Sequence, residues 1–152
     1  MNQNQTQTKP LTIGRVAKLS GVGIDTIRFY ERRGLLHEPA RTPSGYRQYA
    51  PDIVERLHFI LRAKDLGFSL EEVSLLLKLQ DEGGSKAEVK KLTSQKLEQI
   101  ETKIGDLERM RDVLRKLNKD CSGTGDIDSC PIIDALSDGD TCSADKNLKT
   151  GS

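Results

Sequence analysis

The stretch 86–120 constrains the fold more than any other part of this sequence, because it contains no proline and a single glycine, Gly105. At ~1.5 Å per residue, a helix over residues 85–120 would be ~50 Å long. Its apolar residues recur at the a and d positions of a heptad, with Arg111 as an interruption. The a and d residues are Leu97, Ile100, Ile104, Leu107 and Leu114, and Met110, Val113 and Leu117 widen the stripe.

Such a narrow apolar seam on a long helix needs a cover that this chain can hardly supply. Of 152 residues only 35% are hydrophobic and 4% aromatic, which leaves a modest supply of apolar side chains for a core. A second copy of the chain is the natural cover, so we expect a coiled-coil homodimer, parallel or antiparallel. The alternative is that the helix packs back on residues 11–79 as one more helix of a bundle.

Residues 11–82 have the pattern of a small helical domain. Thr12 can cap a first helix, and the segment 20–23 (Ser-Gly-Val-Gly) breaks it before a second helix over 24–33. Gly34 ends that helix, and the segments around 35–36 and 41–49 predict two extended arms joined by a Pro-Ser-Gly turn, a β-wing.

Two further helices complete this domain. Asp52 can cap a third helix that runs to Gly67. Ser69 and Glu72 form a capping-box pattern that opens a fourth helix through Leu79. The expected order is therefore helix, turn, helix, wing and two more helices.

The net charge of +1 conceals a gradient along the chain. Residues 1–70 contain eleven basic and six acidic residues, whereas residues 121–152 contain two and six. A basic surface attracts phosphates and an acidic one repels them, so nucleic acid is a candidate partner of the first part only. Arg28, Thr26 and Tyr30 suit a recognition helix, and Tyr46 and Arg47 suit backbone contacts from a wing.

Specific motifs carry a resemblance to a known family. They are Arg28-Phe29-Tyr30-Glu31, Gly45-Tyr46-Arg47 and Leu66-Gly67-Phe68-Ser69. These motifs occur in this order along the chain, and residues 11–136 resemble the MerR family of bacterial transcription regulators. The resemblance implies DNA contacts by Arg28, Tyr30, Tyr46 and Arg47, with Thr26 as a weaker candidate. It also implies an antiparallel coiled-coil dimer with an effector site at the far end of the coil.

The resemblance further implies a mechanism. The dimer would bind an inverted repeat in a promoter whose spacer is too long for RNA polymerase. Effector binding would then bend and untwist the DNA and realign the promoter elements, which is recognition through DNA shape.

The effector is indicated by cysteines. Cys121 and Cys130 close a glycine-containing loop, and Pro131 can open a short helix whose N-terminus favours thiolates. Soft thiolates favour Cu(I), Ag(I), Au(I), Hg(II), Zn(II) or Cd(II). The loop resembles the metal loop of metal-sensing family members, and its eight-residue interval is more similar to the mercury and zinc type than to the copper type.

Lys86, in contrast, favours a monovalent ion. The divalent sensors of the family place a cysteine from the partner subunit at the start of the dimerisation helix, and the matching position here is Lys86. An ammonium would favour a monovalent ion, since two thiolates around such an ion keep a net negative charge. The competing interpretation is that Lys86 is a solvated residue. Cys142 could add a third ligand, but a bystander in the tail is expected.

We therefore expect a mainly α chain with a winged helix-turn-helix DNA-binding domain, a long dimerisation coiled-coil helix and a C-terminal metal-binding loop with a short helix. The expected segments are a disordered arm (1–10), the DNA-binding domain (11–82), the dimerisation helix (85–120), the metal loop and short helix (121–136) and a flexible acidic tail (137–152). The sequence predicts no enzyme, because no catalytic cluster is recognisable and His37 and His58 are isolated.

The expected location is the cytoplasm, with no membrane-spanning segment. Two other functions stay open. One is a thiol redox or electrophile sensor that uses the same two cysteines, and the other is a thiol-based metal buffer or chaperone.

Overall fold

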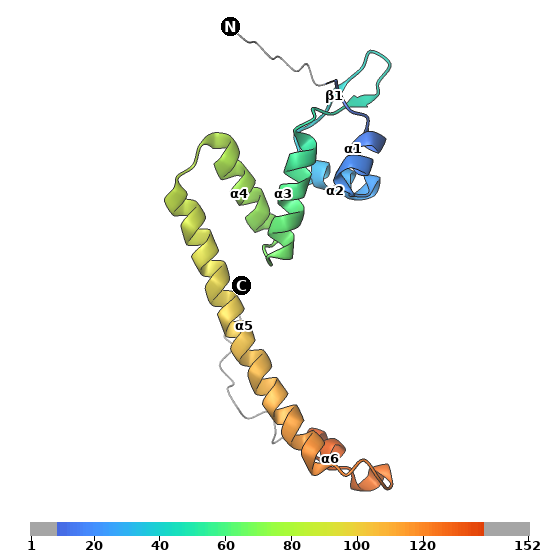
Figure 1. Cartoon of the computed structure of the whole chain (residues 1–152), viewed down its shortest axis with the longest axis vertical. Coiled ribbons are helices and arrows are strands. Elements are labelled where there is room, and N and C mark those ends of the chain that lie inside the picture. Colours follow the sequence, from blue (N-terminus) through green and yellow to red (C-terminus); the bar gives the residue numbers. More distant parts are fainter. Residues whose placement is uncertain (1–8, 139–152) are drawn as a thin grey trace. The chain divides into compact units, whose positions relative to one another are not determined.

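The computed structural model describes residues 9–138 and is mainly helical (Figure 1). The expected arm and tail therefore lie largely outside the described residues, and Cys142 lies outside them entirely. The chain divides into two compact units, one ending at Lys96 and the other beginning at Leu97. The elements are α1 (Ile13–Ser20), α2 (Ile24–Arg32), β1 (Ala40–Arg41), β2 (Arg47–Gln48), α3 (Ile53–Asp65), α4 (Leu70–Glu82), α5 (Lys86–Asp120), a 3-10 turn (Ile127–Ser129) and α6 (Pro131–Ser137).

Helices α1 and α2 form the expected helix-turn-helix. The Thr12 hydroxyl accepts a hydrogen bond from the Arg15 N–H at 3.3 Å, and α1 ends at Gly21 with a left-handed φ of 72°. The Ser20 hydroxyl donates to the Val16 carbonyl at 2.8 Å and accepts from the Val22 N–H at 3.2 Å. These bonds satisfy buried polar groups and fix the turn between the two helices.

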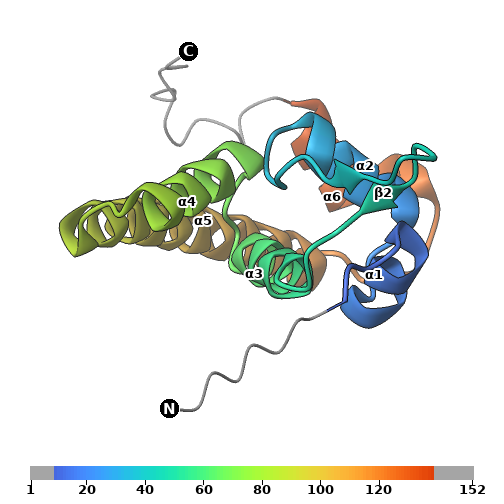
Figure 2. The same cartoon turned by 90° about the horizontal axis from the view of Figure 1, so that it is seen from above.

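The wing is an antiparallel hairpin in which Ala40 pairs with Gln48 and Arg41 with Arg47. A backbone bridge between Leu11 and Tyr49 connects its base to the start of the domain. Figures 1 and 2 show the turn of this hairpin extending outward from α1 and α2. One expectation was wrong, since Leu35 and Leu36 lie in the core, 1% and 3% exposed, instead of in a wing arm.

Helix α4 begins with the predicted capping box, in which Glu72 accepts from the Ser69 N–H at 2.7 Å and the Ser69 hydroxyl accepts from the Glu72 N–H at 3.2 Å. It continues to Glu82, three residues past the expected end at Leu79. Asp52 is the N-cap residue of α3, as predicted, but its side chain makes no capping hydrogen bond. The chain enters α3 through a turn, so the carbonyls of residues 50 and 51 accept the first helical N–H groups instead.

The hydrophobic core belongs to α1–α4 and their connections. Helix α1 packs against α2 and α3, and α3 packs against α4. The buried side chains are Val16, Val22, Ile27, Tyr30, Leu35, Leu36, Tyr49, Ile53, Leu57, Ile60, Ala63, Val73 and Leu77. This core holds the recognition helix and the wing in a set relation to each other.

Helix α5 starts at a second capping box, in which Glu88 accepts from the Ser85 N–H at 2.9 Å. None of its 35 residues is buried in the single chain. Its seam stays open, since Leu97, Ile104 and Leu107 are 56%, 50% and 63% exposed. Near its start, the Lys96 ammonium lies 2.9 Å from Glu72 and above the Phe68 ring. These two contacts connect the start of α5 to α4 and to the segment before it. Among the described helices, none combines the length and apolar character needed to cross a membrane.

Candidate nucleic-acid interface and candidate metal loop

Helix α2 presents two of the predicted DNA-contacting side chains to solvent. Thr26 and Arg28 are both exposed on α2, the second helix of the helix-turn-helix. A recognition helix needs such free donors in its N-terminal half, where base edges come within reach. Their placement suits them to that task.

Tyr30 differs from the other predicted contacts because its side chain is only 3% exposed. Its ring belongs to the core cluster and lies 5.8 Å from the ring centre of Phe29. A broad stacking contact between this ring and DNA is therefore incompatible with the described structure. A contact through the hydroxyl alone stays a prediction.

The wing presents Tyr46 and Arg47 close to its turn. Tyr46 is 73% exposed, and its backbone N–H donates to the Thr42 hydroxyl at 3.0 Å. The Arg41 guanidinium donates to the Gly45 carbonyl at 3.2 Å, so a second bond stiffens the turn. Gly45 has a φ of 88°, a left-handed conformation that favours glycine. The wing is thus an ordered hairpin that carries an exposed aromatic hydroxyl.

A carboxylate that we did not single out from the sequence connects the wing to α2. Glu31 accepts a short hydrogen bond from the Tyr49 hydroxyl, and its other oxygen lies 3.9 Å from Nε of Arg47. Burial raises the pKa of Tyr49 well above its usual range, and Glu31 raises it further, while Arg47 and Arg28 act in the opposite direction. The tyrosine therefore stays protonated and donates permanently. In the sequence, Glu31 was distinguished only by its place in the motif Arg28-Phe29-Tyr30-Glu31.

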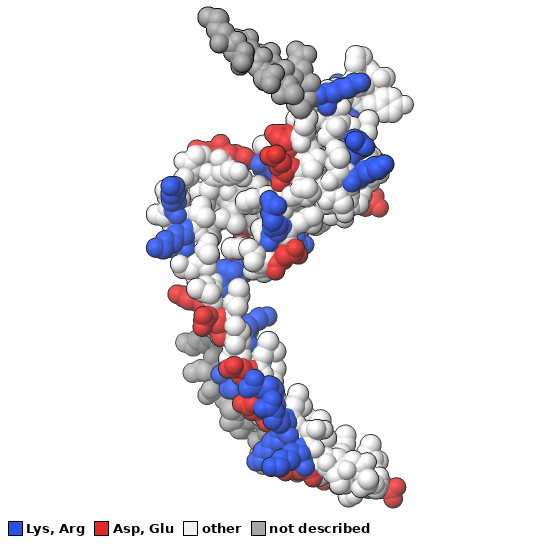
Figure 3. Space-filling view, in the orientation of Figure 1, with Lys and Arg blue, Asp and Glu red and all other residues white. Residues whose placement is uncertain are grey.

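Basic side chains mark the surface around these elements. Figure 3 shows lysine and arginine side chains gathered at the right of the upper part in this view, where the wing and the helix-turn-helix lie. This distribution agrees with the basic excess of residues 1–70. It favours a polyanionic partner on this unit.

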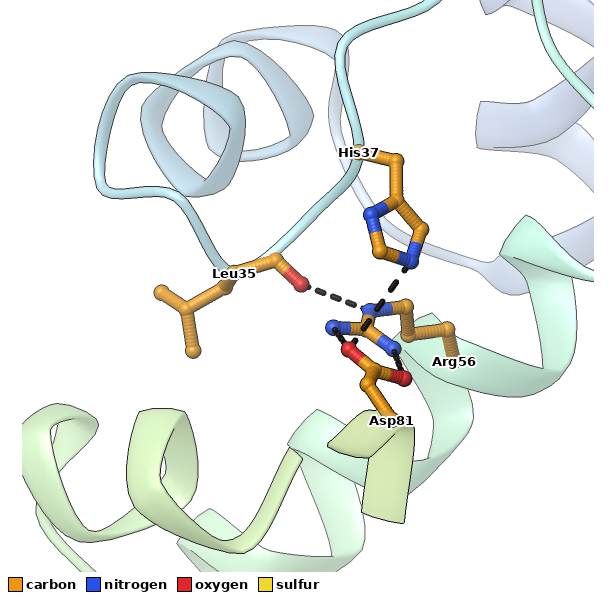
Figure 4. A network of polar contacts seen from close by, with 4 residues as sticks. All are labelled: Leu35, His37, Arg56 and Asp81. Carbon is orange, nitrogen blue, oxygen red and sulfur yellow. Dashed lines mark hydrogen bonds and ion pairs between the residues drawn. The ribbon is translucent and has the colours of Figure 1, made fainter. Parts of the chain in front are cut away.

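A second polar cluster holds α3 and α4 to the segment after α2 (Figure 4). Arg56 donates from Nε to the Leu35 carbonyl at 2.7 Å and from its two terminal nitrogens to Asp81 at 2.9 and 2.8 Å. His37, expected to be structural, lies 3.8 Å from the same carboxylate. The cluster is a structural brace between three parts of the domain.

The two predicted metal-binding cysteines lie at the two ends of one loop. Cys121 directly follows α5 and donates its N–H to the Leu117 carbonyl at 3.2 Å. The loop turns through Gly123 and Gly125, both with positive φ, and then through the 3-10 turn. Both thiols are free and half-buried, so an ion in solution has access to them.

Cys130 occupies the N-cap position of α6, and Pro131 follows as the first helical residue, as predicted. Its side chain makes no close capping bond. Even so, the N–H groups of Ile133 and Ile132 lower the pKa of the Cys130 thiol, and a hydrogen bond with Cys121 adds to this effect against opposition from burial and Asp134. These effects favour a thiolate at Cys130, at the opposite end of the loop from Cys121.

This donor set fits a soft ion held by two ligands from one chain. No group of three or more histidine, cysteine or carboxylate side chains suited to a metal occurs within residues 9–138. Lys86 is exposed at the first position of α5, and the 35-residue helix separates it from Cys121 along the chain. At ~1.5 Å per residue, the 35 residues of α5 correspond to ~50 Å of helix.

Comparison with known proteins agrees with this arrangement. The family model for the MerR helix-turn-helix regulatory protein matches residues 11–80, and the model described as MerR, DNA binding, matches residues 54–117. The mercuric resistance operon regulatory protein of Bacillus cereus is 45% identical over 125 residues, which are 82% of this chain and 95% of that protein.

Two further proteins are similar over most of the chain. The HTH-type transcriptional regulator CueR of Salmonella typhimurium is 41% identical, with 84% of this chain and 92% of that protein covered. The crystal structure of the transcription regulator PbrR691 from Ralstonia metallidurans in complex with lead(II) has a TM-score of 0.77 at 32% identity, and covers 83% of this chain and 98% of that one. With its winged helix-turn-helix and long helix, the chain belongs to the MerR family of DNA-binding transcription regulators, which are not enzymes.

Proposed function

We propose that this protein is a metal-responsive MerR regulator. As a homodimer it binds an inverted repeat in a promoter, and it activates transcription by distorting the DNA when a thiophilic ion binds to Cys121 and Cys130. The observation that carries this proposal is the pair of accessible thiols at the two ends of the loop between α5 and α6, with Cys130 at the N-cap of α6, where helical N–H groups lower the pKa of its thiol. A thiolate is the form that binds such ions.

The relatives support a metal effector but not one particular metal. Their names and descriptions refer to mercuric resistance in one case and to lead(II) in another. Cu(I), Ag(I) or Au(I) with two thiolates would leave a net charge of −1, whereas Hg(II), Zn(II) or Cd(II) would be neutralised. If Lys86 of the partner subunit lies beside the loop, its ammonium would favour the monovalent ions, because their two-thiolate complexes keep a negative charge.

On the DNA side, we assign base-edge contacts to Arg28, supported by Thr26, and backbone contacts to Tyr46 and Arg47. The exposure of these side chains on α2 and the wing supports the assignment. RNA polymerase at the same promoter is the expected second partner, and action on promoter DNA would place the protein in the cytoplasm.

Replacing either loop cysteine by serine tests the metal proposal. Cys121→Ser and Cys130→Ser each remove a soft thiolate, so both should abolish metal-induced transcription in vitro while metal-free DNA affinity stays within about threefold, since no DNA contact changes. Titration with Cu(I) and Hg(II) under reducing conditions measures binding directly. Induction that survives either substitution would disprove the metal loop, and Cys142→Ser serves as the control.

Two arginine variants test the DNA interface. Arg28→Ala should weaken binding by ~1–3 kcal/mol and relax specificity if it contacts a base edge. Arg47→Ala should weaken binding about equally on all sequences and lower the salt slope by ~1 if it contacts a phosphate. Unchanged affinity in both variants would remove α2 and the wing from the interface.

A thiol redox or electrophile sensor is the second candidate, since the same close pair of accessible thiols could form a disulfide. The two functions differ under reducing conditions. Stoichiometric metal binding and metal-dependent transcription in the presence of excess thiol are expected only for the metal sensor.

A further inference from the structure

Glu31 has an unusual position for an acidic residue, because it lies on the helix that we assign to base contacts. Its side chain is 11% exposed, and its two oxygens face different partners. One accepts from the hydroxyl of Tyr49, which is 2% exposed, and the other lies 3.9 Å from Nε of Arg47. The carboxylate thus joins a core residue, α2 and the wing.

We propose that Glu31 is a positioning residue for DNA binding, which holds the Arg47 guanidinium of the wing in a set relation to the Arg28 side chain of α2. The inference rests on the proposed contacts of Arg28 and Arg47 with DNA. Tyr49 and Arg47 lie two positions apart at the end of β2, so a carboxylate anchored by the first is fixed relative to the second.

The distance between Glu31 and Arg47 is important for this role. At 3.9 Å the contact is an ion pair and not a hydrogen bond, because hydrogen bonds between nitrogen and oxygen have lengths of ~2.7–3.2 Å. The five N–H donors of the guanidinium are therefore not consumed by Glu31. Arg47 is also 35% exposed, which leaves part of the group open to a phosphate.

Positioning is valuable for an arginine because its long side chain loses much rotamer freedom when it binds. A nearby carboxylate that restricts this freedom in the free protein reduces the loss on DNA binding. The opposing effect is repulsion between the carboxylate and phosphates. Since Glu31 is nearly buried and directed toward Tyr49, we expect positioning to exceed repulsion.

The test is a double-mutant cycle of Glu31→Gln and Arg47→Ala. The probe is a duplex selected by the wild-type protein from a random library, together with a scrambled duplex, with affinity measured by fluorescence anisotropy at several salt concentrations. Glu31→Gln keeps an acceptor for Tyr49 but removes the charge. It should weaken binding to both duplexes about three- to tenfold and lower the salt slope toward that of Arg47→Ala.

In the Arg47→Ala background, Glu31→Gln should have no further effect. An equal loss in both backgrounds, or tighter binding by Glu31→Gln, overturns the inference. If Arg47→Ala itself changes nothing, the proposed wing contact has failed instead. Glu55→Gln, at an exposed position of α3, is the matched control for loss of one negative charge.

Tyr49→Phe keeps the charge of Glu31 but removes its anchor, and it provides a second route if Glu31→Gln folds poorly. It should produce a smaller loss in the same direction, again absent in the Arg47→Ala background. A general effect on folding would instead lower the melting temperature without coupling to Arg47, and that result would also overturn positioning.

Discussion

The Arg56 side chain is a largely covered cation, only 16% exposed, and one carboxylate compensates its charge. Asp81 binds it through both oxygens, and the Leu35 carbonyl accepts a third hydrogen bond. The Arg56 guanidinium beside Asp81 lowers the pKa of that carboxyl, with a smaller contribution from His37. A lowered pKa in the folded state means that the pair stabilises the protein above the unfolded pKa of the carboxyl, and that this stabilisation is lost as the pH falls through the folded value.

Asp81→Asn should therefore lower the free energy of unfolding at neutral pH by ~1 kcal/mol, a modest value because the carboxylate is 35% exposed and partly screened. The difference from the wild type should vanish in acid, below the ordinary range of an aspartate. Urea unfolding of both proteins between neutral and acidic pH measures the loss at neutral pH and its disappearance in acid. A constant difference across that range would mean that Asp81 acts through packing and not through charge.

At the residue scale, the sequence allowed the outward-facing groups to be predicted but not their partners. Thr26, Arg28 and Tyr46 are exposed as expected. Tyr30 is buried, since helical spacing places it on the same face as the core residue Ile27. The partnership of Glu31 with the wing joins residues far apart in sequence, so no local pattern reports it.

Among the elements, the Glu72 carboxylate of α4 has two tasks and contacts α5. Glu72 closes the capping box of α4 and pairs with Lys96 of α5, and these contacts lower its pKa. The Lys96 ammonium also lies over the Phe68 ring, so the same charge faces α4 and the α3–α4 connection. The start of α5 is fixed to the DNA-binding unit at this point.

Glu72→Ala removes the hydrogen bond from the Ser69 N–H, which is one half of the capping box, together with the ion pair, and should destabilise the protein by ~1–2 kcal/mol. Lys96→Met retains an apolar stem but removes the charge, and should cost less, ~0.5–1 kcal/mol. Thermal unfolding of both variants separates the contributions. Equal losses would show that the cap itself contributes little.

Element positions were largely predictable because caps and glycines mark them. Ser69 and Gly83 lie at the two ends of α4, whereas the capping box of Ser85 and Glu88 at the start of α5 was not predicted. The 3-10 turn over Ile127–Ser129 was not predicted, since three residues provide no periodicity. Asp52 shows that a capping residue type has no effect where backbone carbonyls already satisfy the helix start.

For the whole molecule, the exposed seam of α5 predicts association. Ile104→Asp places a charge at an a position, where burying it unpaired is costly, and should weaken dimerisation at least about tenfold. Thr102→Asp introduces the same charge at an exposed position away from the seam and serves as the control. Sedimentation at micromolar concentration measures the dimer affinity of both variants. A dimer of unchanged affinity in Ile104→Asp would place the interface elsewhere.

The proposed role of Lys86 also requires two chains. Lys86→Cys would supply a third thiolate to the loop of the partner subunit, and should raise the transcriptional response to Hg(II) or Zn(II) relative to Cu(I). Metal-panel transcription assays provide the measurement. An unchanged ratio of divalent to monovalent response would mean that Lys86 is a solvated residue at the start of α5.

The buried side chains of the described structure all lie between Val16 and Leu77, and the cysteine loop supplies none of them. Substitutions in residues 121–136 therefore have little effect on the free energy that folds the DNA-binding unit. Under the proposed function, selection could alter the sensed ion through a few codons in this loop while the operator specificity is inherited unchanged. Such independence would let one lineage acquire a new resistance without first passing through a misfolded regulator.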